Sequence, residues 1–92
     1  MRNFIYTISK STVSRTYGGA NETASIYELK DGEINYIGET KWCTRGYMGE
    51  AGEINRFLLN NNIITAEQSK DRQGTQTPYY CRDNGFYKIS QI

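Results

Sequence analysis

The sequence contains no histidine, one proline and two cysteines in 92 residues. Histidine is the side chain most often used as a general base near neutral pH, and it is the commonest metal ligand. A serine or cysteine nucleophile would therefore have no imidazole to activate it. The composition argues against histidine-dependent hydrolases and against the usual four-ligand zinc domains.

Long apolar runs are also missing, and the net charge is only +1. The longest apolar runs have three residues, far fewer than the ~20 that cross a bilayer. No apolar segment follows Met1-Arg2, so we expect no signal peptide, no membrane partner and a cytoplasmic location. Hydrophobic residues make up 37% of the chain, which is enough for a folded domain, and we predict one domain over residues 1–92.

The two cysteines, Cys43 and Cys81, lack the C-x-x-C spacing that is typical of metal sites. In a reducing compartment we expect both thiols to be free and buried as small apolar groups. A disulfide between them stays open as an alternative.

Tyrosine is unusually abundant, with eight copies beside three phenylalanines and one tryptophan. Tyrosine suits strands and also makes rigid contact surfaces at low entropic cost. Together with the small size, this tyrosine-rich composition resembles that of the accessory proteins of phages and other mobile elements. The composition favours a protein as the binding partner.

The order of the strand and helix signals predicts a small α+β domain. Apolar and aromatic residues alternate over Asn3 to Ser9, and Ala51, Ile54 and Leu58 share one face of a helix expected over Glu50 to Asn60. The other expected elements are a strand or irregular arm over 11–17, a loop over 18–21, a hairpin over 24–38, a β-like run over 63–65, a polar loop over 69–77, and a second hairpin over 78–89 turned on Asn84-Gly85. We predict an antiparallel sheet of four or five strands with one helix packed on a face. Trp42 is expected in the core.

The first hairpin carries the most specific signal in the chain. Asp31-Gly32 supplies the two residues with φ > 0 that a type I′ turn requires. The flanking strands contain Ile26-Tyr27 and Tyr36-Ile37-Gly38, the paired half-motifs of the GIY-YIG endonucleases, and Glu39-Thr40-Lys41 continues in that family's usual wording. From residue 25 to residue 45 the chain resembles this family.

The resemblance implies a phosphodiesterase site. The two tyrosines would be Tyr27 and Tyr36, the arginine that offsets charge on the phosphate would be Arg45, and the glutamate that holds Mg²⁺ or Mn²⁺ would be Glu67. The chain departs from the family pattern at Ser25, which replaces the first glycine. Alternatively, Tyr-Ile-Gly arises by chance in a tyrosine-rich chain, and the hairpin then has a structural role but no catalytic one.

A second candidate site lies in the C-terminal third, where basic and aromatic residues alternate. Such a mixture on a sheet face grips single-stranded nucleic acid, although half-buried tyrosines beside solvated lysines would give the same pattern. The candidate binding residues are Lys70, Arg72, Tyr79, Tyr80, Arg82 and Lys88, with Phe86 and Tyr87 between them.

Two functions follow from these observations. The favoured one is a small non-enzymatic binding protein of phage or mobile-element type, without a cofactor, that inhibits a host nucleic-acid-processing or defence protein. The alternative is a minimal GIY-YIG-like nuclease that depends on Mg²⁺ or Mn²⁺. A nucleic-acid-binding module remains a third possibility.

Overall fold

Three long antiparallel strands dominate the computed structural model, which describes residues 2–13, 20–46, 48–72, 80–83, 86–89 and 92. The strands are β1 (Asn3–Val13), β2 (Ala20–Lys30) and β3 (Glu33–Cys43). A shorter hairpin, β4 (Tyr80–Asp83) and β5 (Phe86–Ile89), completes a five-stranded sheet. The order β3-β2-β1-β5-β4 places the first strand in the middle.

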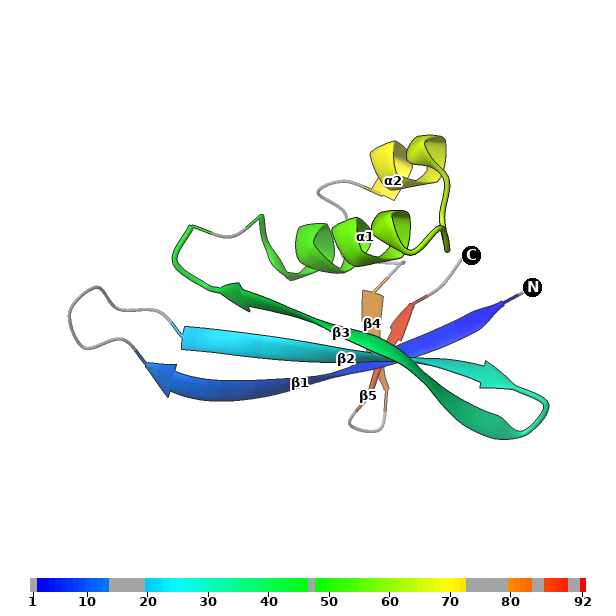
Figure 1. Cartoon of the computed structure of the whole chain (residues 1–92), viewed down its shortest axis with the longest axis horizontal. Helices are drawn as coiled ribbons and strands as arrows, with labels where there is room; N and C mark the ends of the chain where they lie inside the picture. The colour runs from blue at the N-terminus through cyan, green and yellow to red at the C-terminus, as the bar shows by residue number, and fades with distance from the viewer. Residues whose placement is uncertain (1, 14–19, 47, 73–79, 84–85, 90–91) are drawn as a thin grey trace.

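Both helices lie on one side of this twisted sheet (Figure 1). Helix α1 (Glu50–Asn60) packs next to the sheet, and α2 (Ala66–Arg72) lies against α1. The α+β class and the antiparallel sheet are therefore confirmed. The opposite face of the sheet carries no helix among the described residues; we call it the open face.

The β2–β3 hairpin turns on Asp31-Gly32 as the sequence predicts. The φ angles of these residues are 53° and 75°, which is the left-handed pair of a type I′ turn. A bulge follows, because Ile26 pairs with Gly38 whereas Tyr27 pairs with Tyr36, so that Ile37 has no partner in the ladder. The bulge keeps both tyrosines opposite each other on one face.

The strands around the first connection are longer than the sequence indicates. β1 continues to Val13, which pairs with Ala20, so residues 11–13 extend the first strand and do not begin a separate one. Ala20 and Asn21 belong to β2 and not to a loop. The rest of the expected arm and loop, 14–19, lies outside the described residues, as does the predicted turn at Asn84-Gly85.

The core lies between α1 and the sheet. Phe4 and Tyr6, at alternate positions of β1, face the helix and are 0% exposed. The Tyr6 hydroxyl donates to Glu50 Oε2 at 2.6 Å, and its ring stacks on that of Tyr87 at 4.9 Å. Trp42 is in the core as predicted, and its Nε1 donates to Glu22 Oε1 at 3.0 Å. The buried apolar residues are Phe4, Tyr6, Ala24, Ile26, Trp42, Ala51, Ile54, Leu58, Ile64 and Ile89.

Gly38, the glycine of Tyr-Ile-Gly, makes room for α1. A Cβ at this position would lie 3.2 Å from Cζ and 3.3 Å from Cε2 of Phe57. The glycine therefore lets the Phe57 ring approach the sheet, which gives this part of the motif a packing role.

Helix α2 corrects two predictions. Residues 63–65 form no strand and lead into the helix, and residues 69–72, expected in a polar loop, are helical. The helix starts with a capping box, in which Gln68 N donates to Thr65 Oγ1 at 3.1 Å and Thr65 N donates to Gln68 Oε1 at 2.8 Å. This reciprocal pair satisfies backbone donors that a short helix leaves open. The prediction of a single helix was therefore incomplete.

The cysteines lie on the two opposite edge strands, Cys43 at the end of β3 and Cys81 in β4. Four strand spacings separate these edges by about 19 Å, whereas a disulfide needs Cα atoms less than about 7 Å apart. A bond between them within one chain is ruled out. Cys43 is a free, exposed thiol, so the expectation that it is buried is wrong.

None of the helices in the described part of the chain has the length and apolar character needed to cross a membrane.

Candidate functional site

Large apolar side chains gather on one half of the open face, near the β2–β3 turn. The register places Ile5 opposite Tyr27, Tyr27 opposite Tyr36, and Leu29 opposite Ile34. We call the following set the apolar patch: Ile5, Tyr27, Leu29, Ile34, Tyr36 and Phe86. It draws on four strands, β5, β1, β2 and β3.

Much of the apolar patch is in contact with solvent. The exposed fractions are 62% for Ile34, 59% for Tyr36, 41% for Phe86 and 38% for Leu29. These values contrast with 0% for Phe4 and Tyr6 on the same sheet. The exposure is therefore a property of one face and not of a loosely packed sheet.

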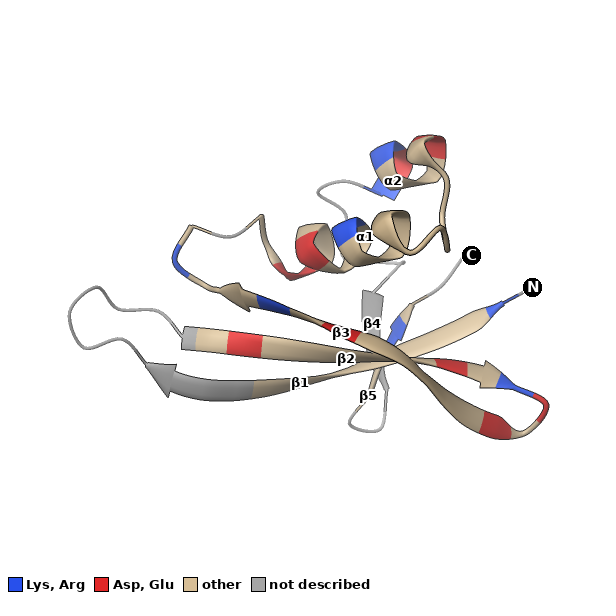
Figure 2. Cartoon of the chain, viewed as in Figure 1, with Lys and Arg blue, Asp and Glu red and all other residues tan. Residues whose placement is uncertain are grey.

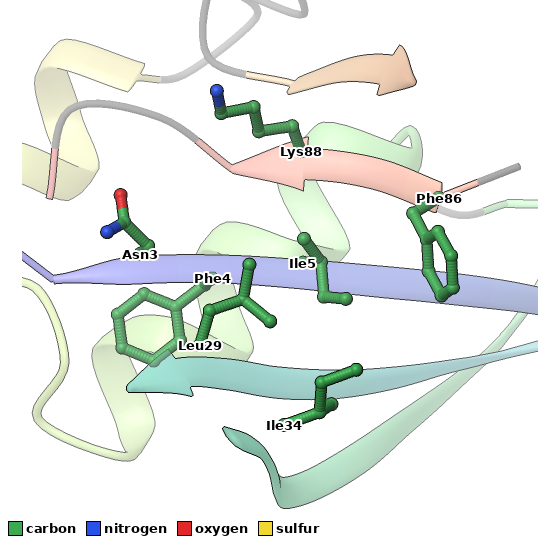
Figure 3. A pocket seen from close by; sticks show the side chains of 7 residues that line it. All are labelled: Asn3, Phe4, Ile5, Leu29, Ile34, Phe86 and Lys88. Carbon is green, nitrogen blue, oxygen red and sulfur yellow. The ribbon is translucent and has the colours of Figure 1, made fainter. Parts of the chain in front are cut away.

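A shallow groove of about 570 Å³ crosses this half of the face. Figure 3 shows Ile5 at its centre, Phe86 on the side of β5, and Leu29 and Ile34 on the side of β2 and β3. The remaining lining residues are Asn3, Phe4 and Lys88. The groove is thus mostly apolar, with an amide and an ammonium group at its edge.

The other half of the open face is polar. Ser25 pairs with Glu39 and Thr23 pairs with Lys41, and Lys41 Nζ lies 3.7 Å from Glu39 Oε1. Over the described part of the chain, basic and acidic residues are interspersed (Figure 2). The described residues therefore present no extended basic surface.

The tyrosines of the nuclease hypothesis lie together. Tyr27 and Tyr36 face each other across β2 and β3 with ring centroids 5.6 Å apart, in an edge-to-face arrangement. Tyr36 is 59% exposed, whereas Tyr27 is half-buried. The hairpin thus presents both phenols on the open face, inside the apolar patch.

The other residues of that hypothesis lie elsewhere. Arg45 is exposed in the bend after Cys43, and the strand from Tyr36 to Cys43 alone spans about 23 Å. Glu67 lies in the first turn of α2, on the helix side of the sheet. The structure therefore brings the tyrosines together, but brings neither Arg45 nor Glu67 to them. In the described part of the chain, no three His, Cys, Asp or Glu residues converge on a possible metal position.

The candidate nucleic-acid residues are divided between the two sides of the sheet. Lys70 is exposed on α2, and Arg72 is only 2% exposed. Lys88 is exposed on β5 and lines the groove of the open face. Tyr80 and Arg82 belong to β4, where only the backbone is described, and residue 79 lies outside the described residues. Lys70 and Lys88 do not share a surface.

Phe86 and Tyr87 lie on opposite faces of the sheet, as neighbouring residues of a strand do. Tyr87 stacks on Tyr6 on the helix side, whereas Phe86 is exposed on the open face. The sequence pattern indicates these two aromatic residues as site candidates, but not the aliphatic members of the apolar patch, Ile5, Leu29 and Ile34. The sequence does hold an indication of them, because β1 and β2 carry apolar residues at both odd and even positions, and therefore on both faces of the sheet.

The fold and its surface define a small α+β protein with one helix-covered face and one partly apolar open face. Comparison with protein families, with curated proteins and with solved structures gives no match. The resemblance to GIY-YIG nucleases therefore rests on the hairpin residues alone.

Proposed function

We propose that this chain is a small non-enzymatic binding protein that docks on another protein through the apolar patch. The observation that carries the proposal is the gathering of four large apolar side chains, Leu29, Ile34, Tyr36 and Phe86, with exposed fractions of 38–62%. Apolar residues scattered singly over a surface need no explanation, but a contiguous patch is typical of an interaction site.

The composition of the apolar patch supports a protein partner. It combines aliphatic residues with tyrosine and phenylalanine, and aromatic residues are enriched in protein interfaces, where charged residues are depleted from the centre. The side chains project from a hydrogen-bonded sheet, so docking requires little ordering of the backbone. A rigid apolar platform of this kind suits recognition better than catalysis.

The test compares two exposed apolar positions. Ile34→Asp places a charge in the apolar patch, while Met48→Asp is the matched control, because Met48 is 55% exposed and precedes α1. Tagged wild-type protein and both variants are used to capture partners from plausible bacterial hosts. We expect Ile34→Asp to lose a stable partner that Met48→Asp retains. Equal capture by both variants, or no stable partner for the wild type, would contradict the proposal.

In its most specific form, the proposal is that this chain is a phage or mobile-element protein that inhibits a host protein of nucleic-acid processing or defence. It is supported by the small size, the tyrosine-rich composition and the absence of histidine. Expression of the chain in a bacterial strain that carries a defence system should raise phage plating, and Ile34→Asp should remove this effect. Unchanged plating across a panel of defence systems would count against it.

A minimal nuclease is the second candidate, because Tyr27 and Tyr36 face each other with ring centroids 5.6 Å apart. It predicts that purified protein nicks plasmid DNA with Mg²⁺ or Mn²⁺ and that Arg45→Ala abolishes the nicking. Intact plasmid after long incubation with both metals would end this hypothesis.

A further inference from the structure

Lys88 gives the groove an electrostatic character. Among the described residues that line the groove it is the one with a charge, and the others are Asn3, Phe4, Ile5, Leu29, Ile34 and Phe86. The ladder places Lys88 opposite Ile5. In the described part of the chain the Lys88 ammonium group has no carboxylate partner, whereas Arg2, Lys41 and Arg56 each form an ion pair. As far as the described side chains show, the groove therefore has an apolar floor and a cation without an ion-pair partner at its edge.

We propose that the groove binds an acidic amphipathic segment of the partner protein. In this inference, which rests on the proposed function, apolar side chains of the segment cover Ile5, Leu29 and Ile34, and an aspartate or glutamate reaches Lys88. A covering partner removes water from around the ammonium group, and a cation left without a counter-charge in such a place is unfavourable. A basic partner would add repulsion to this desolvation. Lys88 thus selects for acidic segments.

The charges on the open face favour an acidic peptide over nucleic acid. A nucleic-acid strand presents one phosphate per nucleotide and is held by a series of cations along its path. The described open face offers Lys88 in the groove, while Lys41 in the polar half is already paired with Glu39. One cation beside aliphatic side chains is suited to one carboxylate.

The size of the groove sets the length of the segment. Its lining residues come from four adjacent strands, β5, β1, β2 and β3, and three strand spacings correspond to about 14 Å. A helix of roughly ten residues covers this distance. A short peptide is therefore a sufficient probe.

The experiment is a selection of random displayed peptides of about 12 residues on the wild-type protein. The selected peptides are then measured against Lys88→Glu, against Ile34→Asp, and against the control Lys70→Glu, since Lys70 is exposed on α2 on the other side of the sheet. We expect peptides that combine apolar residues with aspartate or glutamate. Their affinity should fall about tenfold or more on Lys88→Glu, should be lost on Ile34→Asp, and should not change on Lys70→Glu. A peptide whose acidic residue is replaced by lysine should regain affinity for Lys88→Glu.

The outcomes separate the two proposals. Peptides that lose binding on Ile34→Asp but are indifferent to Lys88→Glu overturn the acidic specificity and leave docking intact. Peptides indifferent to both variants overturn the proposed function as well. A library without enrichment over uncoated beads overturns the inference. It is also overturned if fluorescein-labelled oligo-dT binds the groove with an affinity that Ile34→Asp abolishes and that falls steeply with salt.

Discussion

The two faces of this sheet are built from alternate residues of the same strands, yet the side chains of one face are mostly buried and those of the other are partly or largely exposed. Phe4 and Tyr6 of β1 are fully buried on the helix side, while Ile5 between them belongs to the apolar patch. In β2, Ile26 is fully buried, whereas Leu29 near the turn is 38% exposed. The covered face provides the apolar contacts that folding needs. Apolar residues on the second face add little to stability, and this surplus is the reason for proposing that the open face docks on a partner.

The largest expected effect concerns the covered face. Leu58 in α1 is 0% exposed within the core. Leu58→Ala should lower the free energy of unfolding by about 3 kcal/mol, because it removes buried methyl groups and leaves a cavity. Urea denaturation followed by circular dichroism measures this change. A loss below ~1 kcal/mol would mean that α1 contributes little to the core.

The contact between Gly38 and α1 should produce the next largest effect. A Cβ at Gly38 would come within 3.2 Å of the Phe57 ring. We expect Gly38→Val to destabilise the protein by about 1–3 kcal/mol and Gly38→Ala to destabilise it less. In the Phe57→Ala background the cost of the valine should shrink, because the clashing ring is absent. Strictly additive effects in this double-mutant cycle would contradict the packing role of the glycine.

The hydrogen bond of Tyr6 should contribute less. Its hydroxyl donates to Glu50 Oε2 at 2.6 Å and joins the central strand to the first turn of α1. Tyr6→Phe keeps the buried ring and should lower the free energy of unfolding by about 1 kcal/mol. A thermal melt that coincides with that of the wild type would show that this bond adds nothing to the covered face.

The ion pair at the start of β1 predicts a dependence on pH. Arg2 Nε and Nη2 donate to the two carboxylate oxygens of Glu28, each at 3.0 Å. The hydrogen bond from Arg2 lowers the pKa of the Glu28 carboxyl group and raises the pKa of Arg2. A lowered folded-state pKa stabilises the protein fully above the unfolded-state value, and this contribution is lost as the pH falls through the folded-state value.

The difference in unfolding free energy between the wild type and Glu28→Gln should therefore be constant from neutral pH to about pH 5, then shrink in more acidic solution. The effect should be smaller than that of Tyr6→Phe because water and salt screen the pair. Urea titrations across this pH range measure it. A difference that does not change with pH would show that the pair does not affect stability.

The smallest effect on stability is expected on the open face. Ile34 is 62% exposed, so Ile34→Ala should change the free energy of unfolding by less than ~0.5 kcal/mol. The same substitution should weaken peptide or partner binding, and this separates the roles of the two faces. If Ile34→Ala instead destabilised the protein as much as Leu58→Ala, the apolar patch would belong to the core.

The parts of the fold that could be predicted from the sequence depend on neighbouring residues. Asp31-Gly32 sets its own turn, and the acids at the start of α1 and the asparagines after it define that helix with the observed bounds, Glu50–Asn60. Helix α2 is not predicted by the apolar pattern because its seven residues have no apolar stripe, although Thr65 and Gln68 carry the spacing of a capping box. The extra length of β1 comes from pairing with β2, which local propensity cannot show.

The candidate site was harder to predict, because the helices cover only one face of the sheet, and the sequence does not show which set of alternate residues in each strand lies on that face. Ile5 and Phe4 look alike in the sequence, and only the packing of α1 makes one of them core and the other surface. The position of Lys88 next to Ile5 depends on a pairing between the two ends of the chain. The Tyr27–Tyr36 pair, in contrast, follows from the hairpin register and was predictable.

The central position of β1 has a consequence for how the protein is made. On a ribosome, β1 emerges before the other four strands and can pair with β2 as soon as β2 follows, but its other edge must wait for β5, whose Ile89 pairs with Phe4. Contacts between such distant residues form slowly. Until the last strand is released, the nascent chain presents the unpaired backbone edge of its own central strand, which is where aggregation or chaperone binding would begin.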